Sequence, residues 1–222
     1  KTNEINRLNI EGYVLNASYC RETFVRGGVM ILSKEGLYWR QVVLPLEIQL
    51  AEEKVFEFCA VRYKFCNFHF IVVGVYRSPN SDPFMFLDRL SVLIDFLLKK
   101  SKFVIVGGDI NINVLVKSRE HNELCNMLKS HGMRYLVKFP TRVCDTTATC
   151  LDNFMTNIPD NKISIEGIIS NLSDHDAQIL SLDINSASPK NKPNQNVTCH
   201  TRCFSENNKK LFVDMLSKED WL

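Results

Sequence analysis

Runs of hydrophobic residues predict a chain built mainly of short β-strands. Four runs rich in Val, Ile, Phe and Tyr occur in the first third of the chain, and we expect them to form neighbouring antiparallel strands. These runs are Gly28–Leu32, Val42–Leu46, Val55–Tyr63 and Phe68–Tyr76. Later runs of the same character are Phe103–Val106, Cys150–Thr156, Ile163–Ile169 and Ala177–Ile184.

Two segments instead repeat their apolar residues at helical spacing. The first begins with Asp82, a typical N-cap residue, and Pro83, which is typical of a first helical turn. Its apolar face comprises Leu87, Leu90, Ile94, Leu97 and Leu98. The second helix is predicted over residues 120–130 and stops before Gly132. Strands outnumber helices and both mix along the chain, so the predicted class is α/β or α+β with layered sheets.

One segment differs sharply in composition and divides the chain. Residues 185–198 read NSASPKNKPNQNVT, with Ala187 and Val197 as the only apolar residues, which is typical of a linker. We therefore predict a globular domain over residues 1–184 and a linker over 185–203. A short amphipathic helical segment is expected over 204–222, with Ser205 as its N-cap.

Composition narrows the class further. The chain is 45% hydrophobic and 23% charged over 222 residues, which excludes a disordered chain. Its net charge of +2 gives no overall field toward nucleic acid, so such a contact must be local. The longest apolar runs stop far short of the roughly 20 residues that span a bilayer, so we expect no membrane contact. The chain opens at Lys1 without an initiator Met, and we interpret it as an internal fragment.

Cysteine and most histidine residues are predicted to be structural. The eight cysteines are scattered without a C-x-x-C pair, which indicates buried, reduced thiols in an intracellular compartment. His69 alternates within a strand and is predicted to lie at the surface or to have its polar atoms satisfied. His121 and His131, on or just after a helix, are expected to face solvent. None of the three is predicted to be a ligand.

Candidate chemistry lies in three segments that place polar groups beside buried strands, where an unpaired carboxylate is costly. They are GGDIN at 107–111, TCLDNFMTN at 149–157 and NLSDHDAQIL at 171–180. The Gly-Asp and Ser-Asp pairs are also typical of ordinary turns. A carboxylate flanked by Leu151 and Phe154, however, requires a partner, and His175 is the natural one for Asp152.

These residue types suit cleavage of a phosphodiester, which needs a hard cation, an activated water and donors to the phosphate oxygens. Asp174 can bind magnesium through oxygen, and Asp109 can take the proton of the water. Asn111 can donate to phosphate without adding negative charge. Asp152 can orient His175 and favour its charged form.

The order and spacing of these segments, with GVYRSP at 74–79 and PTR at 140–142, resemble the endonuclease/exonuclease/phosphatase superfamily. The resemblance is strongest to the apurinic-like endonuclease domain of non-LTR, jockey-like retrotransposons, through IEGY, RGGV, VYRSP, GGDIN, FPTR, LDNFMTN and SDHDA. It covers about residues 10–184. It implies a four-layer sandwich of two β-sheets flanked by helices, with the active site at one end of the sheets.

The resemblance also implies roles for individual residues. Asp109 and Asn111 would act in proton transfer and phosphate orientation, Asp152 would pair with His175, and Asp174 would hold the metal. Contacts to the scissile phosphate would come from Tyr76, Thr141 and Ser173. A metal-binding Glu in a Glu-x-Trp motif would precede Lys1, so we expect this fragment to lack half of its metal site.

The sequence thus predicts a magnesium-dependent endonuclease, with manganese as the alternative metal, that nicks DNA to prime reverse transcription in a non-LTR retrotransposon protein. Its expected partners are DNA and, through the rest of the polyprotein, element RNA. Its expected location is intracellular and, when active, nuclear. Two alternatives stay open: a decayed, inactive copy that at most binds nucleic acid, and a phosphoesterase acting on a small molecule or lipid.

Overall fold

A six-stranded mixed sheet carries most of the residues with predicted chemistry. In the computed structural model its strand order is β3-β4-β5-β6-β10-β7. The bounds are Tyr38–Gln41 for β3, Glu57–Phe65 for β4, Phe68–Tyr76 for β5, Phe103–Asp109 for β6, Arg134–Tyr135 for β7 and Asp152–Thr156 for β10. β5 and β6 are parallel and the other neighbours are antiparallel.

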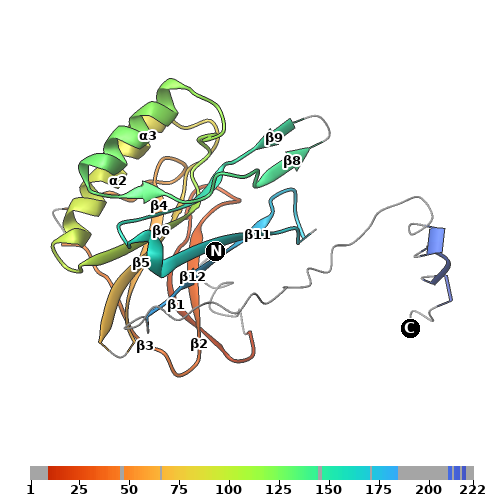
Figure 1. Cartoon of the computed structure of the whole chain (residues 1–222), viewed down its shortest axis with the longest axis horizontal. Helices are drawn as coiled ribbons and strands as arrows, with labels where there is room; N and C mark the ends of the chain where they lie inside the picture. Colours follow the sequence, from red (N-terminus) through yellow and green to blue (C-terminus); the bar gives the residue numbers. More distant parts are fainter. Residues whose placement is uncertain are drawn as a thin grey trace. The chain divides into compact units, whose positions relative to one another are not determined.

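Two helices cover one face of this sheet (Figure 1). α2 spans Pro83–Leu98 and α3 spans Arg119–Ser130. The N-cap Asp82 accepts hydrogen bonds from the backbone N–H groups of Phe84 and Met85, which satisfies donors left free in the first turn. The main core lies between these helices and the sheet. It includes Ile71, Val73, Phe86, Leu90, Leu93, Ile94, Leu97, Val104, Val106 and Leu124.

The opposite face of β4 and β5 packs against a two-stranded sheet made of β1 (Tyr13–Tyr19) and β2 (Val29–Lys34). Because successive strand residues point to opposite faces, Val61 and Val72 contact this layer while Ala60 and Ile71 face the helices. The helix layer, the central sheet and the β1-β2 sheet therefore form successive layers.

Two further hairpins frame the polar segments. β8 (Arg142–Cys144) pairs with β9 (Thr147–Thr149), and β11 (Ile163–Ile168) pairs with β12 (Ala177–Leu182). A 3₁₀ turn at Asp160–Lys162 precedes β11. Gly167 lies against the ring of Phe139, where a side chain would collide with the ring.

The structure describes residues 10–45, 48–65, 67–144, 147–170, 172–184, 210–211, 213–215 and 217–218. The chain divides into two units, residues 1–186 and 187–222. In the second unit the described residues 210, 211 and 213–215 are helical and exposed. The predicted linker over 185–203 lies outside the described residues.

The predicted mixed α/β class is confirmed, and so are both helices and most strands. The strand predicted over Val42–Leu46 is wrong, because the described residues 42–45 form no strand and the paired residues are Tyr38–Gln41. Val42 and Leu44 are apolar because they pack against the main core, and Pro45 has no N–H to pair. The run at residues 28–32 was expected to pair with the other early strands, which is also wrong. It forms β2, which pairs with β1 in a separate sheet.

His131 is a second correction. Its side chain is only 8% exposed, although solvent exposure was expected. The ring lies between Ser91 and Asp95 of α2, with Nε2 2.9 Å from the serine hydroxyl and Nδ1 3.1 Å from the carboxylate. His121 is half-buried beside Tyr135 rather than fully solvated. Both differ because α3 packs back onto neighbouring elements.

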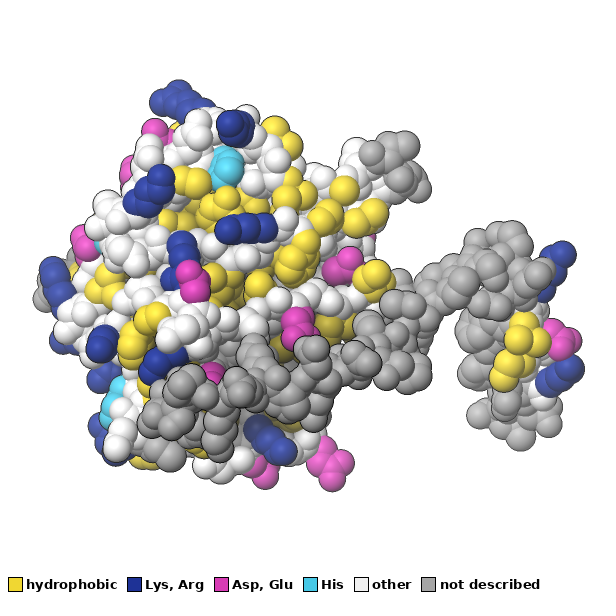
Figure 2. Space-filling view, in the orientation of Figure 1, with side chains coloured by type: hydrophobic (Ala, Val, Ile, Leu, Met, Phe, Trp, Pro, Cys, Tyr) yellow, Lys and Arg dark blue, Asp and Glu magenta, His cyan; other side chains and the backbone are white. Residues whose placement is uncertain are grey.

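Surface features agree with the modest net charge. On the face drawn in Figure 2, basic and acidic side chains are interspersed among hydrophobic ones and do not form a patch of one sign. The five described cysteines are free thiols, with Cys59 and Cys150 buried. No helix in the described part of the chain is long and apolar enough to cross a bilayer.

Candidate active site

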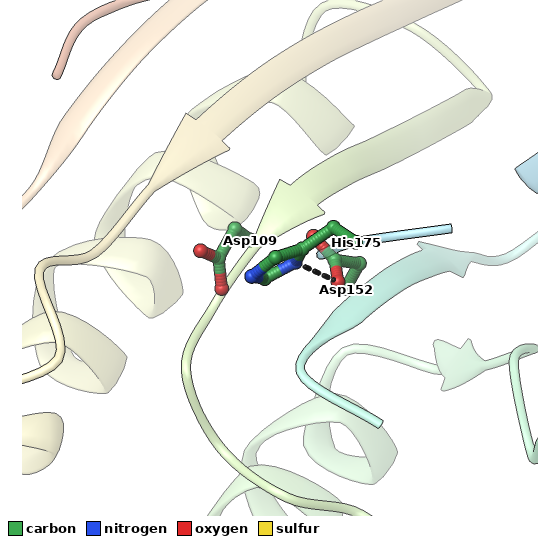
Figure 3. Close-up of side chains that lie close together, drawn as sticks. All are labelled: Asp109, Asp152 and His175. Carbon is green, nitrogen blue, oxygen red and sulfur yellow. Dashed lines mark hydrogen bonds and ion pairs between the residues drawn. The ribbon is translucent and has the colours of Figure 1, made fainter. Parts of the chain in front are cut away.

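Three functional side chains converge where β6 ends and β10 begins. The strand register places Asp152, the first residue of β10, directly opposite Asp109, the last residue of β6. His175 reaches the same place from the segment just before β12 (Figure 3). One ligand atom from each of the three lies within 4.8 Å of the others. The arrangement brings together residues from three separate predicted motifs.

His175 is bound directly to Asp152. Its Nδ1 lies 2.7 Å from Oδ2 of Asp152, and the imidazole sits between the two carboxylates in Figure 3. Because the carboxylate accepts, Nδ1 carries the proton and Nε2 is the ring nitrogen left to face a substrate. A partner of this kind fixes the orientation and the tautomer of the ring.

Thr141 supports this pair from behind. It is fully buried, and its hydroxyl donates to Oδ2 of Asp152 at 2.8 Å. The hydroxyl oxygen of Thr141 also accepts from the backbone N–H groups of Leu151 and Asp152 at 3.0 and 3.2 Å. The buried hydroxyl is thus placed where it can orient the carboxylate of Asp152. The contact of Thr141 with phosphate stays a prediction.

Backbone contacts fix the loop that carries His175. Arg142 and His175 form an isolated antiparallel bridge, and the N–H of Asp176 donates to the carbonyl of Thr141 at 2.7 Å. The exposed Ser173 folds onto the backbone of His175, accepting from its N–H at 3.1 Å and donating to its carbonyl at 3.0 Å. Ser173 therefore shapes the turn, and it lies at the surface beside the cluster.

The carboxyl of Asp109 has an unusually high pKa. Burial, and secondly the negative charge of Asp152, raise the pKa of its carboxyl to about 6. The N–H of Asn111 donates to its Oδ1 at 3.0 Å and His175 partly offsets the effect. A carboxylate of this pKa is mostly ionised at neutral pH and is still basic enough to take up a proton.

Gly108 allows Asp109 to reach this position. Its φ of +148° and its contact with β5 both exclude a side chain, since a Cβ would lie 1.9 Å from the carbonyl oxygen of Val75. The Gly-Gly-Asp sequence is therefore required by the close approach of the two parallel strands next to the site.

Asn111 adopts a left-handed conformation, with φ of +51°, immediately beyond Asp109. Its side-chain amide donates to the carbonyl of Arg77 at 2.7 Å. In return the buried Arg77 guanidinium donates to the carbonyls of Ile110 and Asn111 at 2.7 and 2.6 Å, and to that of Ser81 at 2.6 Å. Arg77 thus holds the loop after β6 in one conformation.

Tyr76 is the last residue of β5 and lies beside Asp109 in the parallel register. The guanidinium of Arg21 lies 5.6 Å from its ring centroid, in a cation-π contact. Arg21 is in turn bonded to the fully buried Glu57, with Nε 2.6 Å from the carboxylate. Glu22, which superficially resembles a metal-binding Glu, is exposed and lies in a loop.

Asp174, the predicted metal ligand, is engaged by an arginine. Nε and Nη2 of Arg142 lie 2.8 and 2.6 Å from Oδ2 of Asp174. This guanidinium holds the pKa of the Asp174 carboxyl below its usual range. Asp174 does not belong to the cluster of Asp109, Asp152 and His175, whose ligand atoms lie within 4.8 Å of one another.

The donor chemistry fits a hard divalent cation. Asp109, Asp152 and His175 offer carboxylate oxygens and one imidazole nitrogen at short mutual distance. The pKa of Asp109 is raised by burial and, second, by the negative charge of Asp152, and a nearby cation would compensate that charge. Asp174, half exposed and bound by Arg142 through Oδ2, is a further carboxylate close in sequence to His175.

Sequence reasoning missed three arginines that organise the site: Arg21, Arg77 and Arg142. Arg77 and Arg142 stand inside the quoted GVYRSP and PTR motifs, so an arginine directly after a buried strand or before a hairpin was the available signal. For Arg21 the sequence held no such signal, because its partner Glu57 lies 36 residues away.

Comparison with solved structures shows the fold. The endonuclease domain of TRAS1, a telomere-specific non-LTR retrotransposon, is similar with a TM-score of 0.62 and 14% identity, over 79% of this chain and 82% of that one. The Neisseria 3′ phosphatase NExo, bound to a product DNA hairpin, has a TM-score of 0.51 and 12% identity, over 77% and 79%. An endonuclease/exonuclease/phosphatase family protein from Leptotrichia buccalis has a TM-score of 0.52 and 12% identity, over 81% and 74%.

No protein-family model and no curated protein sequence matches the chain. The structural likeness nevertheless confirms the fold expected from the motifs. The chain has the endonuclease/exonuclease/phosphatase fold, and this fold includes a retrotransposon endonuclease domain.

Proposed function

We propose that this protein hydrolyses phosphodiester bonds in DNA with magnesium, acting as the endonuclease of a non-LTR retrotransposon protein. The observation that carries the proposal is the cluster of Asp109, Asp152 and His175 at the end of the central sheet. The cluster combines a basic carboxylate with an oriented imidazole, the two groups that a hydrolytic site needs for proton transfer and charge stabilisation. The fold shared with a retrotransposon endonuclease domain supports the choice of substrate.

Asp109 takes the proton of the attacking water. With a pKa of about 6 it is mainly ionised at neutral pH, and it is a stronger base than an ordinary aspartate. The loop pinned by Arg77 fixes the position of this carboxylate relative to the phosphate.

His175 stabilises the charge that develops on the phosphate. Asp152 holds Nδ1, so Nε2 is the ring nitrogen that faces a non-bridging oxygen of the phosphate. Thr141 orients Asp152 and, in this account, does not touch the substrate. Thr141 is fully buried, and exclusion of water strengthens its hydrogen bond to Asp152.

Phosphate recognition falls to neutral donors around the cluster. Asn111 has a second amide hydrogen beyond the one bound by Arg77 and presents it without adding negative charge. The hydroxyl of Tyr76, next to Asp109 in the sheet, and that of the exposed Ser173 are the further contacts we propose.

Magnesium, or manganese in its place, would be held by the carboxylate of Asp174. When bound, it supplies Lewis-acid stabilisation of the phosphate oxygens. The 3′-hydroxyl left by the nick would prime reverse transcription by the rest of the polyprotein. Element RNA is then a second partner, and the nucleus is the place of action.

The experiment that tests this proposal incubates supercoiled plasmid with magnesium and the protein, expressed as residues 1–222 and in its natural reading frame. Nicked circles whose ends a DNA polymerase can extend are expected from the natural reading frame, with little or no nicking by residues 1–222 alone, and EDTA should abolish them. Nicking absent from both forms, with DNA binding retained, would favour the decayed copy. Hydrolysis of small phosphodiesters without nicking would favour the small-molecule phosphoesterase.

A further inference from the structure

Arg142, which is paired with Asp174, has no part in the chemistry proposed above. We propose that Arg142 is a phosphate-binding residue that rests on Asp174 until a divalent cation takes its place. The inference rests on the proposed function, because it concerns how the same site receives its metal and its substrate.

The backbone holds the two residues together. Arg142 is the first residue of β8, and its bridge to His175 places it next to the segment that carries Asp174. Both arginine nitrogens converge on the single oxygen Oδ2. The two side chains are 42% and 50% exposed, so a cation and a phosphate can reach both of them from solvent.

The charges favour an exchange. Asp109 and Asp152 cluster with His175, and Arg142, paired with Asp174, also lies within electrostatic reach of Asp109. A divalent cation on Asp174 would repel the guanidinium, which then needs another anion. The planar fork of arginine matches the paired oxygens of a phosphate, which the substrate brings to this place.

An exposed ion pair is weak, so a divalent cation can displace it at modest cost. The alternative is a static surface pair without influence on ligands. The chain offers a matched example, because Arg134 and Asp160 also form an exposed arginine-aspartate pair, with Nε 2.7 Å from Oδ1, between β7 and the 3₁₀ turn.

Manganese binding to the full chain, followed by electron paramagnetic resonance, tests the first half of the exchange. Arg142→Gln should raise the affinity for Mn²⁺ by roughly 3- to 10-fold, because an exposed pair no longer competes. The Mn²⁺ affinity of Arg142→Lys should lie between those of the wild type and Arg142→Gln, and the affinity of Arg134→Gln should equal that of the wild type. The gain should vanish in Arg142→Gln/Asp174→Asn.

Binding of a labelled DNA duplex with Mn²⁺, in an Asp109→Asn background that prevents cleavage, tests the second half. Arg142→Gln should weaken binding and reduce the salt dependence by about one phosphate contact. Arg134→Gln in the same background should change neither. Melting curves check that each variant is folded.

Unchanged Mn²⁺ affinity, or an unchanged salt dependence of DNA binding, in folded Arg142→Gln would overturn the exchange. These outcomes are separable from the proposed function. If the plasmid is nicked but Arg142→Gln leaves Mn²⁺ affinity unchanged, the proposed function stands and the exchange is wrong. If Arg142→Gln changes both Mn²⁺ affinity and the salt dependence of DNA binding but no nicking occurs, the exchange stands and the proposed function is wrong.

Discussion

Asp152 and His175, 23 residues apart in the sequence, form a direct contact of 2.7 Å between Oδ2 and Nδ1. The carboxylate comes from a central strand of the sheet, whereas the imidazole comes from the segment before β12. The buried hydroxyl of Thr141 binds the same carboxylate oxygen. A histidine held in this way has one fixed orientation, which suits a group that must meet a phosphate.

Replacing Asp152 by Asn should leave the imidazole without its anionic partner. We expect single-turnover nicking to fall by roughly 100-fold or more, the magnitude typical of an acid-base group, with little loss of DNA affinity. Asp160→Asn, which removes an exposed aspartate outside the cluster, is the control. Equal nicking by wild type and Asp152→Asn would show that the pair is not part of the reaction.

The raised pKa of Asp109 should lower the stability of the folded protein at neutral pH. Its folded-state pKa of about 6 lies above the ordinary value of 3.8, so the folded protein binds the proton more tightly than the unfolded chain. The resulting stability is complete below pH 3.8 and is lost as the pH rises through about 6.

The variant Asp109→Asn should therefore be inactive and yet more stable than the wild type by about 2 kcal/mol at pH 7.5, after allowance for partial exposure. The difference should shrink as the pH falls from about 6 toward 4. Urea unfolding across this range is the measurement. A destabilised Asp109→Asn at pH 7.5 would contradict the charge assigned to this site.

Thr141 distinguishes a positioning role from a substrate contact. Thr141→Val keeps the shape but removes the hydroxyl bound to Asp152, and we expect kcat to fall roughly tenfold while KM stays constant. Thr141→Ser should restore most of kcat. A rise in KM with constant kcat would return Thr141 to the phosphate contact predicted from the sequence.

Asn111 should be more sensitive to added charge than to loss of its side chain. Asn111→Asp places a carboxylate against the carbonyl of Arg77 and toward the phosphate, whereas Asn111→Ala only removes the amide. Nicking rates should follow the order wild type, Asn111→Ala, Asn111→Asp, in variants that melt cooperatively. Equal or reversed rates for the two variants would remove Asn111 from the site.

Much of the fold follows from local patterns, and the exceptions have physical causes. β4 and β5 are long and apolar on both faces, because layers cover both sides of them, and their sequence predicts them clearly. β1 was not predicted, since its buried Asn16 interrupts the apolar run. The Asn16 amide oxygen is bound by the buried Tyr63 hydroxyl at 3.1 Å, a partner 47 residues away.

The candidate site also combines features that the sequence predicts with features that depend on tertiary packing. The motif order was sufficient to predict that Asp152 meets His175, because a strand carboxylate needs a partner. Neither the burial of Thr141 nor the pairing of Arg142 with Asp174 could be predicted, since both arise from the way the β8 hairpin lies against the segment before β12. Such contacts depend on tertiary packing, which a local pattern does not encode.

The most direct test of the account is single-turnover cleavage of a labelled DNA duplex by His175→Gln, with magnesium and the protein in its natural reading frame. His69→Gln is the matched control, because His69 is an exposed histidine on β5 outside the cluster. The account predicts that His175→Gln loses roughly 100-fold or more of the rate, with DNA affinity nearly unchanged, while His69→Gln cleaves as the wild type does. Equal cleavage by His175→Gln and His69→Gln would contradict the assignment of the catalytic centre to this cluster.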